Sequence, residues 1–242
     1  MKAFGVTDNG IVRSMNQDTY VISKSDKYLV VAVCDGMGGE KAGDVASGIT
    51  ASDFADSCLL EIKNNTNINS VLINACKVAN SHVYGLSLSN PDYSGMGSTL
   101  VGGIISRDGA CSIVNVGDSR AYYISRRQKK ITRITKDHSY VQCLVDRGII
   151  TPAEAKYHKL RNAITMAVGT EAHIDPDCYK VKLSGGDVLL LCSDGVHNVI
   201  EDNELLEIVL EHTKEELICR AIVNLALYRG APDNITVCTV LK

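Results

Sequence analysis

The stretch VVAVCDGMGG, residues Val30–Gly39, decides how this sequence is interpreted. Its first half is a continuous apolar run rich in β-branched residues, which predicts a buried strand over residues 27–35. The run ends at Asp35, whose carboxylate is costly to bury without a partner. Three glycines follow within the next four residues, the first at Gly36, and let the backbone come close to a bound group. A carboxylate and a bare backbone carbonyl at one point suit Mg²⁺ or Mn²⁺, although an ordinary Asp-Gly turn would also explain this stretch taken alone.

The composition is that of an ordinary globular protein, with 242 residues, 45% hydrophobic and 22% charged. The net charge of −3 and the sequence pI of about 6.1 argue against nucleic-acid binding, which needs a basic footprint. A basic run, RRQKK at 126–130, is expected at a solvated hairpin tip, with docking of an acidic partner as the alternative. No apolar run approaches the roughly 20 residues that cross a bilayer, and the N-terminus lacks a signal peptide's apolar region. We therefore expect a cytoplasmic protein that binds neither nucleic acid nor membrane.

The nine cysteines include no C-x-x-C pair, and no Cys/His cluster has the spacing of zinc ligands. Several lie inside apolar runs, so we expect buried, reduced thiols that act as small hydrophobic side chains. No cysteine is followed six positions later by arginine. This absence excludes the usual thiolate and phosphate-loop arrangement of cysteine-dependent phosphatases.

Two apolar patterns predict the secondary structure. Short apolar runs predict strands over residues 3–8, 18–23, 27–35, 98–106, 110–116, 120–125, 131–134, 178–183, 187–193 and 235–241. Helical spacing predicts helices over residues 44–62, 68–86, 141–147, 153–159, 202–212 and 215–229. Hairpin signals dominate and regular βαβ alternation is absent, which favours mainly antiparallel sheets with segregated helices. No linker or repeat interrupts the chain, so we expect a single domain over residues 1–242.

Four further aspartates stand where a predicted strand begins or ends, as Asp35 does. They are Asp18 after RSMNQ, Asp118 after SIVNVG, Asp194 after VLLLCS and Asp233 just before the strand ITVCTV. Each alone is explained as a turn former or a cap, but five in such similar settings indicate one site. Carboxylates gathered there would repel one another, and divalent cations would keep them ionised.

A site of carboxylates without His or Cys ligands indicates Mg²⁺ or Mn²⁺. Two such ions close together can bridge and deprotonate a water at neutral pH and orient a phosphoryl group for in-line attack. Arg13, five residues before Asp18, is the candidate to hold the phosphate, because its planar fork matches two phosphate oxygens. The alternative for Arg13 is an ordinary residue of a surface turn.

Seven short segments, in order over nearly the whole chain, carry a resemblance. They are R-S-M-N-Q-D (13–18), C-D-G-M-G-G (34–39), G-S-T-L (97–100), V-G-D-S-R (116–120), T-K-D-H-S (135–139), C-S-D-G (192–195) and D-N-I-T-V (233–237). Together they resemble the metal-dependent protein phosphatases of type 2C, in their bacterial form. The resemblance implies an α+β fold, a four-layer αββα sandwich of two mainly antiparallel sheets flanked by helix pairs. It also implies hydrolysis of phosphoserine and phosphothreonine on proteins that a cognate serine/threonine kinase phosphorylates. A monomer is expected by default.

By motif matching, the resemblance assigns roles to individual residues. Asp35 would bridge two metal ions, and the Gly36 carbonyl would reach one of them directly or through water. Asp18, Asp194 and Asp233 would complete the second metal site, with Asp35 and Asp233 essential for catalysis.

The resemblance also assigns Asp118, together with Asp194, to a third ion, so that two or three Mn²⁺ or Mg²⁺ ions are expected. Arg13 would be a catalytic residue that holds the substrate phosphate. Residues 139–170 match the flap beside the active site of the family.

One position departs from the pattern of many eukaryotic members. They carry a histidine after the Asp-Gly pair as the presumed proton donor to the leaving oxygen, whereas this chain has Met37, which cannot donate. An alkoxide is a poor leaving group, so another group should protonate it. A water on the third ion, His158 and His138 are the candidates, although a supporting role for His138 and simple exposure of His158 are the alternatives.

Two functions of other classes stay open. A non-catalytic relative could bind a phosphoprotein, but such a protein should have lost ligands, and none is lost here. A metal-dependent phosphodiesterase or nuclease would use similar carboxylates. The acidic pI and the absence of a basic, aromatic-lined groove argue against it.

Overall fold

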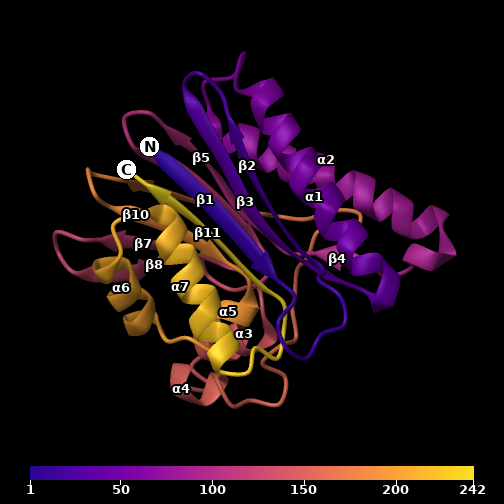
Figure 1. Ribbon diagram of the computed structural model, residues 1–242. Helices are drawn as coiled ribbons and strands as arrows, with labels where there is room; N and C mark the ends of the chain where they lie inside the picture. The colour runs from indigo at the N-terminus through magenta and orange to yellow at the C-terminus, as the bar shows by residue number, and fades with distance from the viewer.

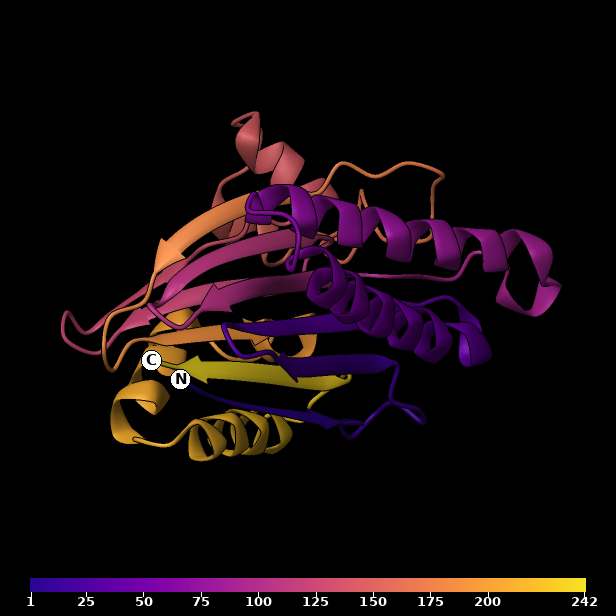
Figure 2. The same cartoon turned by 90° about the horizontal axis from the view of Figure 1, so that it is seen from above.

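Two antiparallel β-sheets stack face to face in the computed structural model, and helices cover the outer side of each sheet (Figures 1 and 2). The structure describes residues 1–39 and 42–242. Every pair of neighbouring strands in the two sheets is antiparallel. Among the described residues, no helix is both long enough and apolar enough to span a lipid bilayer.

The first sheet has the strand order β1-β11-β10-β7-β8, and the second has the order β2-β3-β5-β6-β9 with β4 paired to β3. The strands of the first sheet are β1 (Lys2–Asp8), β11 (Ile235–Leu241), β10 (Val188–Cys192), β7 (Arg120–Ser125) and β8 (Lys130–Arg133). Those of the second are β2 (Asp18–Lys24), β3 (Tyr28–Met37), β4 (Gly97–Ser98), β5 (Leu100–Ser106), β6 (Ala110–Val116) and β9 (Asp177–Lys182).

Two long helices cover the second sheet and two shorter ones cover the first, as Figure 2 shows. These helices are α1 (Gly39–Glu61) and α2 (Ile68–Ser89) on the second sheet, and α6 (Asp202–Glu211) and α7 (Glu215–Tyr228) on the first. Four single-turn or two-turn helices complete the fold: η1 (Pro91–Tyr93), α3 (Tyr140–Asp146), α4 (Pro152–Ala155) and α5 (Asp194–His197).

Three apolar layers form the core, and the alternation of side chains along β3 explains them. Val30 and Ala32 pack toward α1 and α2, whereas Val31 and Val33 pack against the opposite sheet. Because successive residues of a strand point to opposite faces and both faces are covered, the strand is apolar without interruption. The continuous apolar run at 30–34 is therefore the signature of a strand buried on both sides.

The structure corrects the predicted elements in several places, and helix α1 begins at Gly39 instead of residue 44. Strand β3 does not end at Asp35 but continues to Met37, because Gly36 and Met37 pair with β4. The second helix of the flap, predicted over 153–159, ends at Ala155, one turn after its capping box at Thr151. The short helix α5, which begins at Asp194, was not predicted.

The segment 139–170 carries α3 and α4 and lies at one end of the sandwich, at the bottom of Figure 1. An isolated bridge from Ser98 to Val168 attaches it to the rest of the protein, and a second bridge, from Ser139 to Ile164, joins two parts of the segment itself. Since Ser98 belongs to β4, this segment is attached directly beside the end of β3. The end of β3 is also where the acidic residues gather.

Candidate active site

The antiparallel register of β2 and β3 places two of the predicted carboxylates side by side. Asp18, at the start of β2, is the direct partner of Asp35, near the end of β3. Residues in such positions have Cβ atoms about 4.5–5.5 Å apart. Ser193, which follows β10 in the other sheet, donates a hydrogen bond from Oγ to Asp18 Oδ2 at 2.7 Å. The two sheets are thus joined by this hydrogen bond at the first pair of carboxylates.

The other predicted residues come from the turns of both sheets at the same end. Asp194 begins α5 directly after β10, and Asp233 stands before β11. Asp118 lies in the turn from β6 to β7. Arg13 in the β1–β2 loop donates from Nη2 to Asp233 Oδ2 at 2.8 Å.

These residues border one pocket of about 450 Å³. Its lining includes six of the seven predicted site residues: Arg13, Asp35, Gly36, Asp118, Asp194 and Asp233. The seventh, Asp18, is 6% exposed and lies next to Asp35. The structure therefore brings the predicted residues together, although they are up to 220 positions apart in the chain.

The close approach of the carboxylates changes how readily they ionise. Burial and then repulsion from Asp18 and Asp194 raise the pKa of Asp35 well above its usual range. Burial, with Asp118 and Asp233 nearby, raises the pKa of Asp194 to about 8. Burial also raises the pKa of Asp18 to about 6.

The pKa of Asp118 is raised to about 6 as well, by burial and by the neighbouring Asp137 carboxylate. Carboxylates at this density hold protons at neutral pH unless a cation balances their charge. The electrostatics of the pocket therefore favour a cation.

The oxygen atoms present also fit a hard cation. Asp18 Oδ1 is buried and has no hydrogen-bond partner, which is costly for a carboxylate oxygen unless a ligand satisfies it. Within the described part of the chain, no three His, Cys, Asp or Glu side chains form a ready-made set of ligands for one ion. Mg²⁺ keeps several waters and needs only one or two carboxylates, so pairs such as Asp18 and Asp35 or Asp118 and Asp194 could each hold an ion.

The glycine after each of two aspartates is required by close backbone packing. A Cβ atom on Gly36 would lie 1.9 Å from Gly43 O, and one on Gly195 would lie 1.9 Å from Asn234 O. Gly36 N also donates to Gln17 O at 3.1 Å, within a strand that continues past it. Gly36 therefore does not make the turn expected after Asp35 but lets helix α1 approach the strand.

Two polar residues that hold the site in place were missed as functional residues in the sequence. Asn234 accepts from Gln17 N at 2.9 Å through Oδ1, and its Nδ2 donates to the carbonyls of Asn9 and Met15, each at 2.9 Å. These bonds fix the loop that carries Arg13. The signal was present, because Asn234 directly follows Asp233 in D-N-I-T-V (233–237), one of the segments that carry the resemblance.

The second such residue is Thr99, which holds Asp35. Its Oγ1 accepts from Asp35 N at 2.9 Å, and its own N–H donates to Asp35 O at 2.8 Å. Thr99 is fully buried and also bonds Ser119 Oγ at 2.7 Å. It belongs to the quoted G-S-T-L segment, so its position, though not its role, was visible in the sequence.

The two candidate histidines lie away from the pocket lining. His138 accepts from Gly117 N at 3.1 Å through Nδ1, and its Nε2 lies 3.2 Å from Asp177 Oδ2, so both ring nitrogens support the loop. His158 is half-buried in the flap and accepts from Leu160 N at 3.1 Å. Met37 does line the pocket, and the flap contributes Asn162 and Ile164 instead of a histidine.

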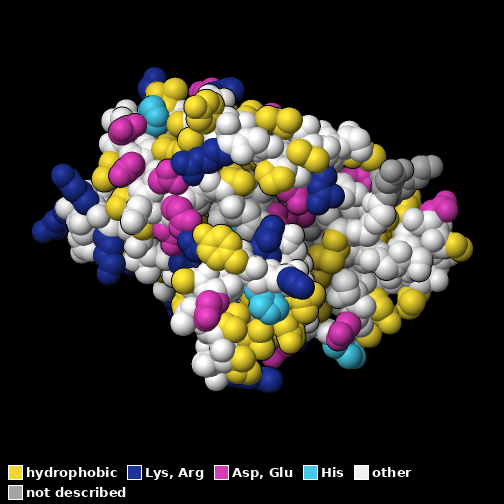
Figure 3. Space-filling model, turned by 90° about the horizontal axis from the view of Figure 1, so that it is seen from below, with side chains coloured by type: hydrophobic (Ala, Val, Ile, Leu, Met, Phe, Trp, Pro, Cys, Tyr) yellow, Lys and Arg dark blue, Asp and Glu magenta, His cyan; other side chains and the backbone are white. Residues whose placement is uncertain are grey.

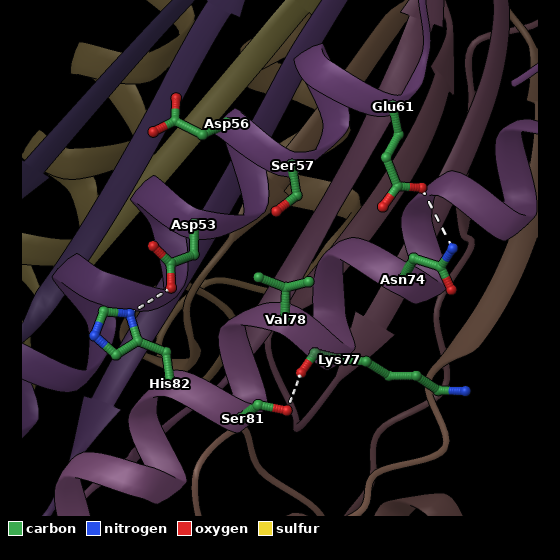
Figure 4. Close-up of a pocket in the computed structure, with 9 residues that line it drawn as sticks. All are labelled: Asp53, Asp56, Ser57, Glu61, Asn74, Lys77, Val78, Ser81 and His82. Carbon is green, nitrogen blue, oxygen red and sulfur yellow. Dashed lines mark hydrogen bonds and ion pairs between the residues drawn. The ribbon is translucent and has the colours of Figure 1, made fainter. Parts of the chain in front are cut away.

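A larger and more open cleft of about 780 Å³ lies between α1 and α2 on the outer surface (Figure 4). Its polar side chains pair with one another: His82 Nδ1 lies 2.7 Å from Asp53 Oδ2, and Asn74 bonds Glu61 at 3.3 Å. None of the predicted site residues lines it. The carboxylate pocket, although smaller, is therefore the candidate active site.

Comparison with known proteins identifies the family. The protein phosphatase 2C family profile matches residues 11–219. This chain belongs to the protein phosphatase 2C family. Phosphatases of this family are metal-dependent, in agreement with the oxygen-rich pocket.

Curated relatives of the family match along almost all of this chain. The serine/threonine phosphatase stp of Listeria monocytogenes serotype 4b is 34% identical over 240 residues, which cover 97% of this chain and 93% of that protein. The serine/threonine protein phosphatase PstP of Mycobacterium tuberculosis is 35% identical over 231 residues, which cover 96% of this chain. The chain spans only 43% of the length of PstP.

Solved structures of serine/threonine phosphatases superpose closely on this chain. Serine/threonine phosphatase Stp1 from Staphylococcus aureus has a TM-score of 0.91 and 36% identity, covering 100% of this chain and 94% of that one. The catalytic domain of PstP in complex with two manganese ions has a TM-score of 0.85 and 32% identity, covering 98% and 96%. The predicted family and the sandwich fold are thereby confirmed.

Proposed function

We propose that this chain hydrolyses phosphoserine and phosphothreonine monoesters on proteins, with two or three Mn²⁺ or Mg²⁺ ions in the carboxylate pocket. The observation that carries the proposal is the pocket that Arg13 shares with four aspartates, with Asp18 beneath them. When bound, such ions activate water and neutralise charge on the phosphate. The named relatives are serine/threonine phosphatases, which supports phosphoproteins as the substrate class.

The aspartates would divide the ions among them. Asp35, adjacent to both Asp18 and Asp194, would serve two ions, together with Asp233 and the Gly36 carbonyl. Asp118 and Asp194, whose charges repel each other across the pocket, would hold a third. Thr99 and Ser193 keep Asp35 and Asp18 in place through the hydrogen bonds described above.

Arg13 would bind the phosphate group of the substrate. Its guanidinium is half exposed at the pocket and already contacts Asp233. Repulsion between a phosphate dianion and the carboxylates is offset by a bidentate cation at this position. The proton for the leaving oxygen does not come from Met37, which carries no donor.

Residues 139–170 would act as the flap of a single domain over 1–242, because Asn162 and Ile164 reach the pocket. We further propose a monomer in the cytoplasm, opposed by a serine/threonine kinase. Free cysteines support a reducing compartment, since seven of the nine are buried and none is paired in the described residues.

A metal-titrated assay tests the proposal. Phosphothreonine and phosphotyrosine peptides are assayed with the chelated protein and then with increasing Mn²⁺ or Mg²⁺, for wild type, Asp35→Asn, Asp233→Asn and Asp118→Ala. We expect hydrolysis of the phosphothreonine peptide only with metal, and its near loss in Asp35→Asn and Asp233→Asn. Activity that persists in EDTA, or nuclease activity in its place, would contradict the proposal.

A further inference from the structure

Two adjacent hydrophobic side chains stand exposed next to the arginine of the candidate active site. Ile11 is 63% exposed, Val12 is 69% exposed, and Arg13 follows them in the chain. A single exposed hydrophobic residue needs no explanation, but a pair beside a pocket is a feature of binding surfaces. Ile11 and Val12 are called here the apolar shelf.

The loop that carries the apolar shelf is held firmly against the body of the protein. Ile11 N donates to Ala231 O at 3.1 Å, and Asn234 holds the loop at Asn9 and Met15. Gly10 has φ +74°, and a Cβ atom there would lie 2.3 Å from Asp233 O, so the loop sits directly on the backbone of a pocket residue. The backbone of a loop fixed in this way loses little freedom when the loop binds a partner.

Exposed hydrophobic residues are concentrated around the pocket as a whole. Of the thirteen large hydrophobic side chains that are exposed among the described residues, seven lie in only two segments, 9–17 and 139–170. These seven are Ile11, Val12, Met15, Tyr140, Ile149, Tyr157 and Leu160. Both segments also line the pocket, through residues 13–15 and 17 on one side and 162 and 164 on the other. Figure 3 looks onto this end of the molecule and shows hydrophobic side chains gathered on the lower lobe of the face.

We propose that the apolar shelf selects phosphoprotein substrates with a bulky hydrophobic residue next to the phosphorylated one. This inference rests on the proposed function, which places the phosphate at Arg13. An extended peptide advances about 3.3 Å per residue, so the neighbour of a phosphorylated residue held by Arg13 lies within reach of Val12 and Ile11. Burial of a hydrophobic side chain against the shelf removes apolar surface of both partners from water.

The test compares two phosphothreonine peptides that differ only in the residues flanking the phosphothreonine, leucine in one and serine in the other. A small aryl phosphate, which has no flanking residue, is the third substrate. The readout is the ratio of kcat/KM for the leucine peptide to kcat/KM for the serine peptide, in metal-loaded protein. The variants are Ile11→Ser with Val12→Ser, Val12→Ser alone, and Leu60→Ser as the matched control, since Leu60 is 67% exposed on α1.

We expect wild type to favour the leucine peptide on the order of tenfold, the scale of discrimination by one apolar contact. The double variant should bring the ratio close to one, Val12→Ser should lower it part of the way, and Leu60→Ser should leave it as in wild type. Melting temperatures equal to that of wild type would establish that the variants are folded. No preference in wild type, or a preference that survives the double variant, would overturn the inference, while metal-dependent hydrolysis of both phosphothreonine peptides would uphold the proposed function. If none of the three substrates is hydrolysed, both the inference and the proposed function are refuted.

Discussion

Replacement of Asp194 by asparagine should stabilise the metal-free protein and remove part of its response to metal. The pKa of this carboxyl is raised from 3.8 to about 8 by burial and by the charges of Asp118 and Asp233. Between these two pH values the folded protein therefore holds a proton that the unfolded chain releases. The free energy of unfolding is accordingly highest below about pH 4 and falls as the pH rises toward 8. Asparagine has the same size, cannot ionise, and can still accept the 3.0 Å hydrogen bond from Asn198.

The size of the effect follows from the shift in pKa. Each unit corresponds to about 1.36 kcal/mol, so the full shift would cost about 4 kcal/mol of folding free energy at pH 7. Asp194 keeps some contact with solvent at the pocket, and the neighbouring carboxyls adjust when it ionises, so we expect a gain of about 1–2 kcal/mol from the variant. For a chain of this length, that gain raises the Tm by about 2–8 °C.

The assay is thermal denaturation of chelated protein at pH 5 and pH 8, repeated with excess Mn²⁺. Wild type should lose Tm between pH 5 and pH 8 without metal and regain it with metal, because only the folded site binds the ion. Asp194→Asn should show a smaller loss and a smaller regain, whereas Asp26→Asn, at an exposed turn, should behave as wild type. The reasoning is refuted if metal-free Asp194→Asn melts below wild type at pH 8, or if its pH dependence is unchanged.

Three further predictions concern the packing around the site, each measured by denaturant or thermal unfolding. Thr99→Val should destabilise the protein by about 1–3 kcal/mol, because the buried Asp35 N–H loses its acceptor, while Thr99→Ser should recover most of the loss; equal stability of both variants would contradict this role. Gly195→Ala should lower the free energy of unfolding by several kcal/mol, because its Cβ would lie 1.9 Å from Asn234 O. Gly85→Ala in α2, where the added Cβ has open space, should be neutral or stabilising by up to about 1 kcal/mol. Similar effects of the two changes would contradict this prediction. Arg120→Leu should lower the free energy of unfolding by about 3–5 kcal/mol, because the buried Asp137 carboxylate loses one of its two cationic partners, Arg120 Nη2 at 2.7 Å. The double change Arg120→Leu with Asp137→Leu should lower it by less than the single change does.

Most of the fold followed from apolar patterns, for a physical reason visible in β3. Its run of apolar residues packs against helices on one side and the other sheet on the opposite side, so local sequence and burial agree. The end of this strand was predicted wrongly because Gly36 looks like a turn residue. It remains in the strand through pairing with β4, about 60 residues away, which no local pattern reports.

The carboxylates of the site could be predicted because each stands where a strand begins or ends, and in this sandwich these strand ends meet. The residues that hold them could not be assigned a role in the same way. Asn234 and Thr99 act through hydrogen bonds to backbone atoms of distant segments, such as Asn9 and Asp35. Such bonds depend on how two distant segments of the chain approach each other in space, and they leave no periodic pattern in the sequence of either segment.

The two crowded glycines described above divide the neighbourhood of the pocket into a part that tolerates change and a part that does not. At Gly36 and Gly195 a backbone oxygen occupies the place where any side chain would begin, so libraries randomised there should return glycine alone. The side chains of Ile11 and Val12, by contrast, are 63% and 69% exposed, so no such backbone contact restricts them. New substrate preferences in this scaffold should therefore arise at the rim of the pocket, while the glycines of its floor should stay unchanged.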